Sequence, residues 1–297
     1  LMKEPSPKGM DRLVLSGLSQ LEKMYFSQVE KKRTADMAAA VSAHVPVISV
    51  GNITAGGTGK TPCILMLAEL FRSIGKKPAI ISRGYKSGLE KEGGCVSDGS
   101  SILVSQQMAG DEPYMMERKL PSVPIFIGKD RIASVKRAEE MGVGILLLDD
   151  GFQYWKLRRD QDIILIDATN PFGYGHGLPR GLLREPLDAL SRASLFILTK
   201  SDQVHLTDLM EIREELARLA PGVPVLSSTH APSKVVPYEK WKAFLHEGTL
   251  EDVRMKKAYL VSGIGNPAAF KKTAKEAGLR PVGEMPFPDH HRYTEED

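Results

Sequence analysis

The first forty residues carry apolar side chains at helical spacing, with basic residues beside and after them. The positions that recur at this spacing are Val14, Leu18, Leu21, Tyr25 and Val29, with Leu15 and Phe26 widening the face. This pattern predicts an amphipathic helix. Such a helix either packs on its own domain or lies in the interface of a membrane, and the pattern is compatible with both.

From residue 45 onward, short apolar runs alternate with stretches of helical periodicity. The runs predict strands at Val45–Val50, Pro78–Ser82, Val123–Ile127, Ile145–Asp149, Ile163–Asp167, Leu195–Thr199 and Val223–Ser227. The stretches between them predict helices at Thr61–Ser73, Asp130–Met141 and Thr207–Leu219. Most runs are nearly continuous in Val, Ile and Leu, as in strands buried on both faces of a parallel sheet. We therefore expect an α/β fold with a mostly parallel sheet flanked by helices.

The rhythm of apolar runs restarts near residue 230. Strands are expected at Val235–Glu239, Ala258–Ser262 and Pro281–Pro286, with a helix at Pro267–Ala277. We therefore predict an N-terminal helical segment at 1–40, a core domain at 41–230 and a smaller α/β domain at 231–297. The residues before Asp297 have the pattern of a helix that is beginning, so we expect this smaller domain to continue beyond them.

A glycine-rich segment lies between the first predicted strand of the core domain and its first helix. Its sequence is Val-Gly-Asn-Ile-Thr-Ala-Gly-Gly-Thr-Gly-Lys-Thr, and the residues expected to bind phosphate are Thr54, Ala55, Gly56, Gly57, Thr58, Gly59, Lys60 and Thr61. The glycines allow a tight turn whose N–H groups point at phosphate oxygens, beside the positive end of the next helix. In such a loop Lys60 neutralises phosphate charge and the Thr61 hydroxyl binds Mg²⁺. The strict pattern is broken at Thr54, which replaces the usual first glycine, but the segment still predicts a P-loop NTPase-like core.

Two acidic pairs follow in the core domain. The strand predicted at Ile145–Asp149 is followed directly by Asp150, and in parallel sheets the carboxyl ends of strands collect ligands. P-loop proteins hold Mg²⁺ at such a strand end, and adjacent side chains point to opposite sides, so one carboxylate is expected to face the metal. Asp111 and Glu112 form the second pair, which suits either a general base for a sugar hydroxyl or the N-terminus of a helix.

Three further segments are ambiguous when taken alone. Arg83 and Tyr85 follow a predicted strand, where they either contact phosphate and a base or sugar, or form an ordinary strand-to-loop junction. The tetrad Thr199-Lys-Ser-Asp202 is similar to the nucleobase-reading tetrad of GTPases, with Thr in place of Asn. Residues 170–184 are rich in glycine and basic side chains, which suits a contact with an anionic substrate or a solvated loop.

Composition narrows the function classes. The chain has 297 residues, of which 42% are hydrophobic and 26% charged, as in a globular protein. Its net charge of +3 is too small to indicate nucleic-acid binding, but it is compatible with an anionic substrate or membrane surface. The two cysteines form neither a metal-ligand nor a disulfide pattern, and no obligate protein partner is evident. No apolar run reaches the roughly 18 residues of a membrane span, and no signal peptide is visible.

Taken in order, the motifs resemble the tetraacyldisaccharide 4′-kinase family of Gram-negative bacteria. They are the phosphate loop up to Pro62, Ser82-Arg-Gly-Tyr85, Gly110-Asp-Glu-Pro113, Asp149-Asp-Gly-Phe-Gln153, Leu183-Arg-Glu-Pro186 and Phe287-Pro-Asp-His290. The resemblance runs from about residue 10 to the C-terminus. It implies ATP and Mg²⁺, and an acylated disaccharide-1-phosphate lipid whose 4′-hydroxyl receives the γ-phosphoryl group to give the lipid A precursor lipid IVA. It also implies peripheral or monotopic attachment to the cytoplasmic face of the bacterial inner membrane, through the N-terminal helix.

The resemblance further implies roles for individual residues. Asp111 and His290 correspond to the catalytic pair of the family, and Lys60 to the cation that stabilises the transferring group. The residues implied for the metal are Thr61, Glu112, Asp149 and Asp150. Those implied for substrate binding are Arg83, Tyr85 and Arg184.

The chain departs from the family pattern in two places. Tyr154 stands where the family often has His, and the further strand and helix that the family carries after Phe-Pro-Asp-His are not among these residues. Two hypotheses of other classes stay open. One is a nucleotide-switch protein of the GTPase or partitioning-ATPase type, which the phosphate loop and the Thr199–Asp202 tetrad favour. The other is a membrane-docking module that binds nucleotide without turnover.

Overall fold

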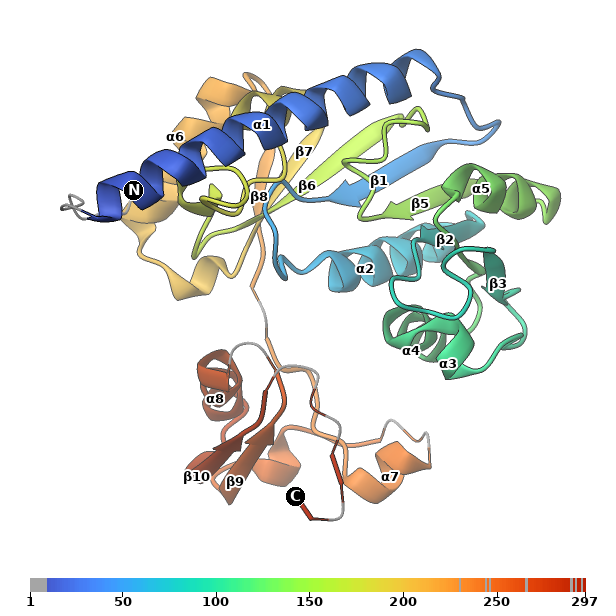
Figure 1. Cartoon of the computed structure of the whole chain (residues 1–297). Coiled ribbons are helices and arrows are strands. Elements are labelled where there is room, and N and C mark those ends of the chain that lie inside the picture. The colour runs from blue at the N-terminus through green and yellow to red at the C-terminus, as the bar shows by residue number, and fades with distance from the viewer. Residues whose placement is uncertain are drawn as a thin grey trace. The chain divides into compact units, whose positions relative to one another are not determined.

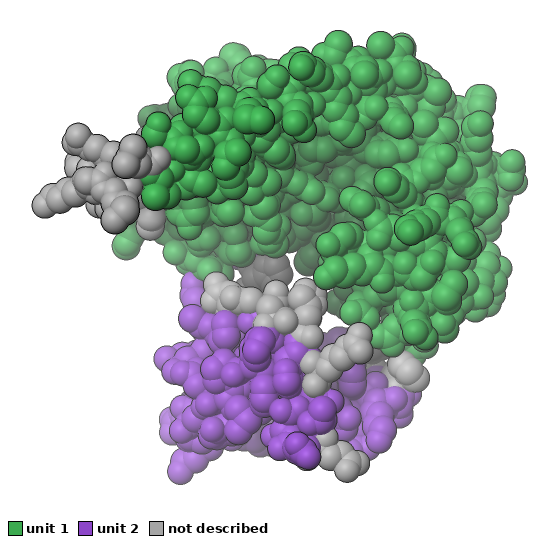
Figure 2. Space-filling model, in the orientation of Figure 1, with its two compact units in different colours: residues 1–228 green, residues 229–297 purple. Residues whose placement is uncertain are grey.

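The computed structural model describes residues 10–229, 231–243, 245, 247–264, 267–288, 291, 293–294 and 296–297. The contacts between residues divide the chain into two compact units, Leu1–Ser228 and Thr229–Asp297, which Figure 2 shows in different colours. We call them the core unit and the C-terminal unit. Each unit has its own sheet.

The core unit is built on an eight-stranded sheet. Its strands are β1 (Val47–Gly51), β2 (Pro78–Ser82), β3 (Gly94–Ser97), β4 (Ile125–Ile127), β5 (Ile145–Asp149), β6 (Gln161–Asp167), β7 (Leu195–Thr199) and β8 (Val225–Ser227). They lie in the order β3-β4-β2-β5-β1-β6-β7-β8, and the neighbouring strands are parallel except for β3 with β4. The predicted mostly parallel sheet is therefore confirmed.

Helices cover both faces of this sheet (Figure 1). They are α1 (Met10–Ala38), α2 (Lys60–Ser73), α3 (Gln106–Ala109), α4 (Asp111–Lys119), α5 (Arg131–Glu140) and α6 (Leu206–Leu219). Alternate strand residues belong to different faces: Leu147 of β5 packs in one apolar cluster with α2 and α4, whereas Leu146 and Leu148 pack with α5. On β6, Ile164 and Ile166 pack with α6. The core unit is thus a three-layer α/β structure, as the sequence predicts.

The C-terminal unit contains two parallel strands, β9 (Lys257–Ser262) and β10 (Arg280–Pro286), joined through α8 (Pro267–Glu276). The strand predicted at Val235–Glu239 is wrong. Residues 231–237 form no regular element, and helix α7 (Tyr238–Lys242) begins directly after them. Pro237 explains the difference, because it lacks the N–H that a strand must donate and its φ of −55° suits the position that precedes a helix.

The apolar residues of helix α1 divide into an inner side, partly buried against the rest of the core unit, and an exposed outer side. The residues that are partly buried against the core unit are Leu15, Leu18, Tyr25, Phe26 and Val29. On the outer side, Val14, Leu21 and Met24 expose 57%, 50% and 60% of their surface. The predicted helix is confirmed, and the predicted apolar stripe is partly buried and partly exposed. In the part of the chain that the structure describes, no helix is both long and apolar enough to cross a membrane.

Candidate active site

The phosphate loop connects the carboxyl end of β1 to the first turn of α2. Gly56 and Gly59 have φ values of 118° and 87°, a region that glycine occupies without strain. Gly59 is the N-cap of α2, and no side chain caps this helix end, so its first N–H groups are available to an anion. A second segment supports the loop, because the Ala55 N–H donates to the carbonyl oxygen of Leu182 at 2.7 Å.

Two cations converge beside this loop. The Lys60 ammonium lies 3.2 Å from Asn52 Oδ1 and 3.7 Å from Asp150 Oδ1. Arg184 donates to both carboxylate oxygens of Asp150, at 2.8 and 2.9 Å, and to Asn52 Oδ1 at 3.1 Å. We call Lys60, Arg184, Asp150 and Asn52 the cation cluster. Fixed positive charge next to a phosphate loop is what stabilises a phosphoryl group during transfer.

The two adjacent acids at the end of β5 have different surroundings. Asp149 is buried and accepts a hydrogen bond from Ser82 Oγ at 2.9 Å, and burial raises its pKa in spite of that bond. Burial acts in the same direction on Asp150, but hydrogen bonds from Arg184 and the charge of Lys60 outweigh it and hold the pKa of Asp150 well below its usual range. Asp150 therefore belongs to the cation cluster, whereas Asp149 is directed towards β2.

Helix α4 brings the second acidic pair to the same edge. Glu112 Oε1 accepts a hydrogen bond from Thr61 Oγ1 at 3.1 Å. Its charge adds to the rise in the pKa of Asp149 that burial causes. Asp111 is the first residue of α4 and accepts a hydrogen bond from Gln106 Nε2 at 3.1 Å. The pair does begin a helix, and through Glu112 it also contacts the phosphate loop.

Arg83 and Tyr85 are not part of the cation cluster. Arg83 and Tyr85 follow the end of β2, but Arg83 Nε donates to Glu90 Oε1 at 2.7 Å and its guanidinium lies 5.7 Å from the Tyr85 ring centre. This ion pair holds Arg83 on the loop after β2, outside the cation cluster. His290 lies outside the described residues, so its pairing with Asp111 stays a prediction.

The oxygen donors beside the phosphate loop suit Mg²⁺, which prefers hard oxygen ligands. They are the Thr61 hydroxyl and the carboxylates of Glu112 and Asp149. Among the described residues, no three His, Cys, Asp or Glu side chains converge into a ready-made metal site. Such an arrangement fits an ion that keeps several waters and completes its coordination with substrate phosphates.

Comparison with known proteins decides the family. The chain matches the family model described as tetraacyldisaccharide-1-P 4′-kinase over residues 12–297. The chain belongs to this kinase family. Its activity is therefore phosphoryl transfer, and the kinase hypothesis is favoured over the nucleotide switch and the docking module.

Individual relatives agree with this assignment. A tetraacyldisaccharide 4′-kinase of Desulfatibacillum aliphaticivorans is 41% identical over 256 residues, which cover 84% of this chain and 67% of the relative. One from Halothermothrix orenii is 37% identical over 297 residues, with 97% and 77% of the two chains covered. The solved structure of LpxK from Aquifex aeolicus in complex with ATP superposes with a TM-score of 0.72 at 29% identity, covering 95% of this chain and 84% of that one.

One residue of the candidate site, Arg131, is not singled out by the sequence patterns. It is buried, and its Nη1 donates to the carbonyl oxygen of Asp150 at 2.9 Å. Its guanidinium stacks 5.1 Å from the Tyr154 ring centre, and its backbone N–H donates to the Tyr154 hydroxyl at 3.0 Å. Burial lowers the pKa of Arg131, while the charges of Asp149 and Asp150 oppose that shift. Tyr154, at the position where the family often has His, therefore helps to hold a cation behind the acidic pair.

Two motif residues without an assigned role, Gln153 and Glu185, form a buried network. Gln153 Nε2 donates to Glu185 Oε1 at 2.9 Å and to the Asn52 carbonyl oxygen at 3.1 Å. Arg192, the last residue of the 3₁₀ helix η2 (Leu187–Arg192), donates to both Glu185 oxygens at 3.0 and 2.8 Å. Only 1% of Glu185 is exposed, and the Arg192 guanidinium lies 4.2 Å from the Phe152 ring centre. The network therefore helps to hold in place the two segments that contain Asp150 and Arg184.

The tetrad that is similar to a nucleobase reader lies at the same edge of the sheet. Thr199 ends β7, and a Cβ placed on Gly59 would lie 3.7 Å from Thr199 Cγ2, so the tetrad flanks the end of the phosphate loop. Lys200 has a left-handed backbone, with φ of 54°, and pairs with Asp167 at the end of β6. Asp167 therefore neutralises the charge of Lys200, and Lys200 is not part of the cation cluster.

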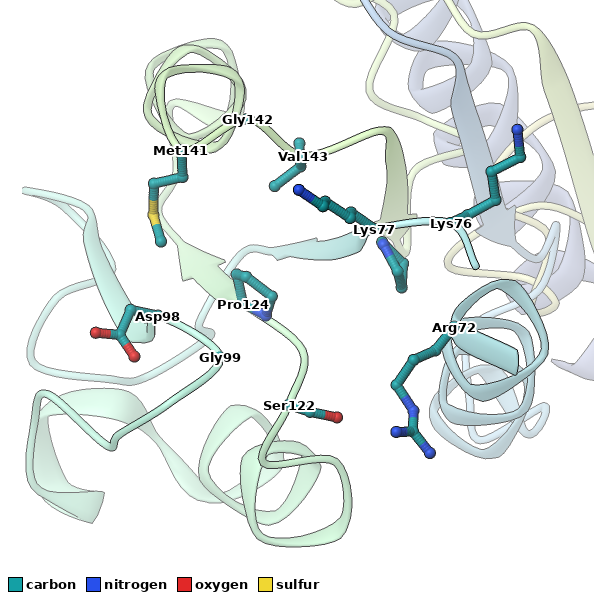
Figure 3. Close-up of a pocket in the computed structure, with 11 residues that line it drawn as sticks. Arg72, Lys76, Lys77, Asp98, Gly99, Ser122, Pro124, Met141, Gly142 and Val143 are labelled. Carbon is teal, nitrogen blue, oxygen red and sulfur yellow. The ribbon is translucent and has the colours of Figure 1, made fainter. Parts of the chain in front are cut away.

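A hollow lies at the opposite edge of the same sheet. Figure 3 shows this cavity of about 360 Å³, which lies at the amino ends of β2, β4 and β5. The charged residues that line it are Arg72, Lys76, Lys77 and Asp98. Because the phosphate loop and both acidic pairs lie at the carboxyl ends of the strands, this cavity is not part of the candidate site.

Proposed function

We propose that this chain transfers the γ-phosphoryl group of ATP to the 4′-hydroxyl of tetraacyldisaccharide-1-phosphate, a step of lipid A biosynthesis. The observation that carries the proposal is the cation cluster beside the phosphate loop, in a member of this kinase family. The solved relative described as a complex with ATP supports ATP as the donor.

The donor phosphates are bound by the loop and by the two cations. N–H groups of the loop and of the first turn of α2 donate hydrogen bonds to the phosphate oxygens, and Lys60 lies at the start of that turn. In phosphoryl transfer the charge spreads over the oxygens of the transferring group, so Lys60 and Arg184 stabilise the transition state from preset positions. Bound phosphate competes with Asp150 and Asn52 for the same two cations.

The metal is assigned to the oxygen donors on the other side of the loop. Thr61, Glu112 and Asp149 would hold Mg²⁺, and Asp150 stays with Arg184. When bound, Mg²⁺ supplies charge neutralisation on the β- and γ-phosphates. Ser82 keeps the Asp149 carboxylate oriented by its hydrogen bond.

Asp111 is assigned as the general base for the 4′-hydroxyl, with His290 as its partner. A carboxylate suits this role because phosphoryl transfer requires alignment of the hydroxyl and only modest proton removal. Its position supports the assignment: Asp111 opens α4 one residue before Glu112, which contacts Thr61 of the phosphate loop.

The outer face of α1 is assigned to the membrane in which the acceptor lipid lies. Val14, Leu21 and Met24 are exposed apolar residues of this helix, and Lys23 and Lys31 are exposed basic residues of the same helix. A helix that exposes both apolar and basic side chains is suited to bind the interface of an anionic bilayer. This supports peripheral attachment at the cytoplasmic face of the bacterial inner membrane.

The direct test uses γ-labelled ATP, Mg²⁺ and tetraacyldisaccharide-1-phosphate in detergent micelles. We expect label in the lipid, and a loss of about 10²-fold or more in the Asp111→Ala variant. Asp98→Ala, at the opposite edge of the sheet, is the matched control and should retain full activity. Hydrolysis of ATP without labelled lipid would instead support a nucleotide switch.

A further inference from the structure

The inner face of α1 holds the loop that carries Arg184. We call residues 173–184 the Arg184 loop, and Figure 1 shows α1 running alongside this part of the chain. Glu22 Oε1 accepts a hydrogen bond from the Gly177 N–H at 2.6 Å. Arg180 Nη1 donates to Ser19 Oγ at 2.9 Å. Two successive turns of the helix therefore bind two successive parts of the loop.

Packing reinforces these hydrogen bonds. The Phe26 ring lies so close over Gly177 that a Cβ at this position would collide with it. Phe26 also packs against the apolar cluster that contains Leu183, the residue before Arg184. The loop is thus sandwiched between α1 and the core of the unit, which limits its freedom to move.

Tyr25 holds the backbone of Arg184 itself. Its hydroxyl donates to the Arg184 carbonyl oxygen at 3.1 Å, although the two residues are 159 positions apart in the chain. The Arg184 N–H donates to the Ile53 carbonyl oxygen, in the phosphate loop, at 2.8 Å. Both backbone polar groups of Arg184 are therefore occupied, one by the phosphate loop and the other by α1. Its guanidinium projects from this fixed backbone to Asp150.

We propose that Tyr25 is a positioning residue for Arg184, so that α1 completes the phosphate site with its inner face. The proposal rests on the proposed function, because it takes Arg184 as a cation for the transferring phosphoryl group. A shift of about 1 Å in a catalytic group costs up to about 10²-fold in rate, so a hydrogen bond that fixes its backbone affects turnover. The outer face of the same helix remains free for the membrane.

The test is a double-mutant cycle of Tyr25→Phe with Arg184→Ala, read from kcat for lipid phosphorylation. Tyr25→Phe removes only the hydroxyl, and we expect kcat to fall about three- to tenfold, the effect of one hydrogen bond. In the Arg184→Ala background the same change should leave kcat within about 1.5-fold, because the residue that Tyr25 positions is gone. An equal loss in both backgrounds, or no loss with Arg184 present, would overturn the proposal.

Controls separate positioning from general damage. Tyr174→Phe removes an exposed phenol from the same loop and should leave kcat unchanged. Glu22→Gln keeps an oxygen acceptor for the Gly177 N–H and should retain more activity than Glu22→Ala. If wild-type protein phosphorylates no lipid, the proposed function fails, and the same cycle is read from the Kd for ATP. Weaker ATP binding only while Arg184 is present would still support the inference, and equal weakening would overturn it.

Discussion

The two edges of the core sheet both carry basic side chains but hold them very differently. At the carboxyl edge, Lys60 and Arg184 share the acceptors Asp150 and Asn52, and Arg131 is buried behind them. At the amino edge, Arg72, Lys76 and Lys77 line an open cavity (Figure 3). There the Arg72 guanidinium pairs with Glu69 on its own helix, and 48% of each side chain is exposed.

The comparison shows what separates a site from a charged surface. A solvated side chain keeps its rotamer freedom and is screened by water, so it fixes no ligand geometry. Cations that share partly buried acceptors are already ordered and need little reorganisation when a phosphate arrives. The following predictions test whether the two edges differ in this way.

The largest difference is expected in turnover. Lys60→Ala should lower kcat by about 10²- to 10³-fold, because it removes one preset charge from the transferring group. Lys77→Ala, at the amino edge, should change kcat by less than about twofold. Steady-state phosphorylation of the lipid acceptor measures both, and comparable losses in the two variants would contradict the difference between the edges.

A second difference is expected in stability. Arg192→Met leaves the Glu185 carboxylate buried and without its cation, so the free energy of unfolding should fall by about 3–5 kcal/mol. Arg72→Met removes a solvated ion pair and should leave the urea midpoint unchanged. A loss below about 1 kcal/mol for Arg192→Met would mean that Glu185 is adequately solvated.

A smaller loss of stability is expected when a side chain is added to Gly51, at the end of β1. A Cβ on Gly51 would lie 2.6 Å from Phe152 Cβ, so Gly51→Ala overpacks the junction between the phosphate loop and the acidic strand. We expect a loss of about 1–3 kcal/mol in the free energy of unfolding. Gly17→Ala is the control, because this helical position has open space around it and should gain up to about 1 kcal/mol. Denaturant unfolding of both variants provides the measurement.

The smallest effect concerns the outer face of α1. Leu21→Gln should weaken binding to vesicles that contain anionic lipid by about three- to tenfold, since it removes one apolar side chain from the docking face. Leu226→Gln, which changes a similarly exposed leucine on β8, should not alter vesicle binding. Vesicle sedimentation distinguishes the two, and equal effects would mean that α1 does not dock.

Much of the fold follows from local sequence patterns. The predicted bounds of β2, β5 and β7 agree with the structure, because these runs are apolar except for their last residue and are largely buried on both faces. β3 is not predicted, and of α4 only a possible start at Asp111 and Glu112 is. The four residues of β3 include Gly, Cys and Ser, which are not typical of a strand. They form a strand because they pair with the antiparallel β4, and no local sequence pattern reveals this pairing. The sequence also does not reveal which side of α1 is buried, since Leu18 and Leu21 are the same residue type and differ only in their burial.

The candidate site also contains residues that the local sequence predicts and residues that only the fold brings together. The phosphate loop is predictable because its glycines and the helix after it are consecutive in the chain. Arg184 is assigned only through the family resemblance, because its partner Asp150 is 34 positions away and the sheet alone brings them together. The contacts of Arg192 and Tyr25 with the site give no sequence signal, since the folded chain alone brings these partners together.

The central claim is that the carboxyl edge of the sheet, and not the amino edge, binds the nucleotide. Hydrogen–deuterium exchange with and without ATP and Mg²⁺ tests it directly, because it reports on individual backbone N–H groups in the intact protein. We predict slower exchange in residues 55–62, which form the phosphate loop and the first turn of α2, and no change in residues 72–78. Unchanged exchange at 55–62 together with protection at 72–78 would contradict the account.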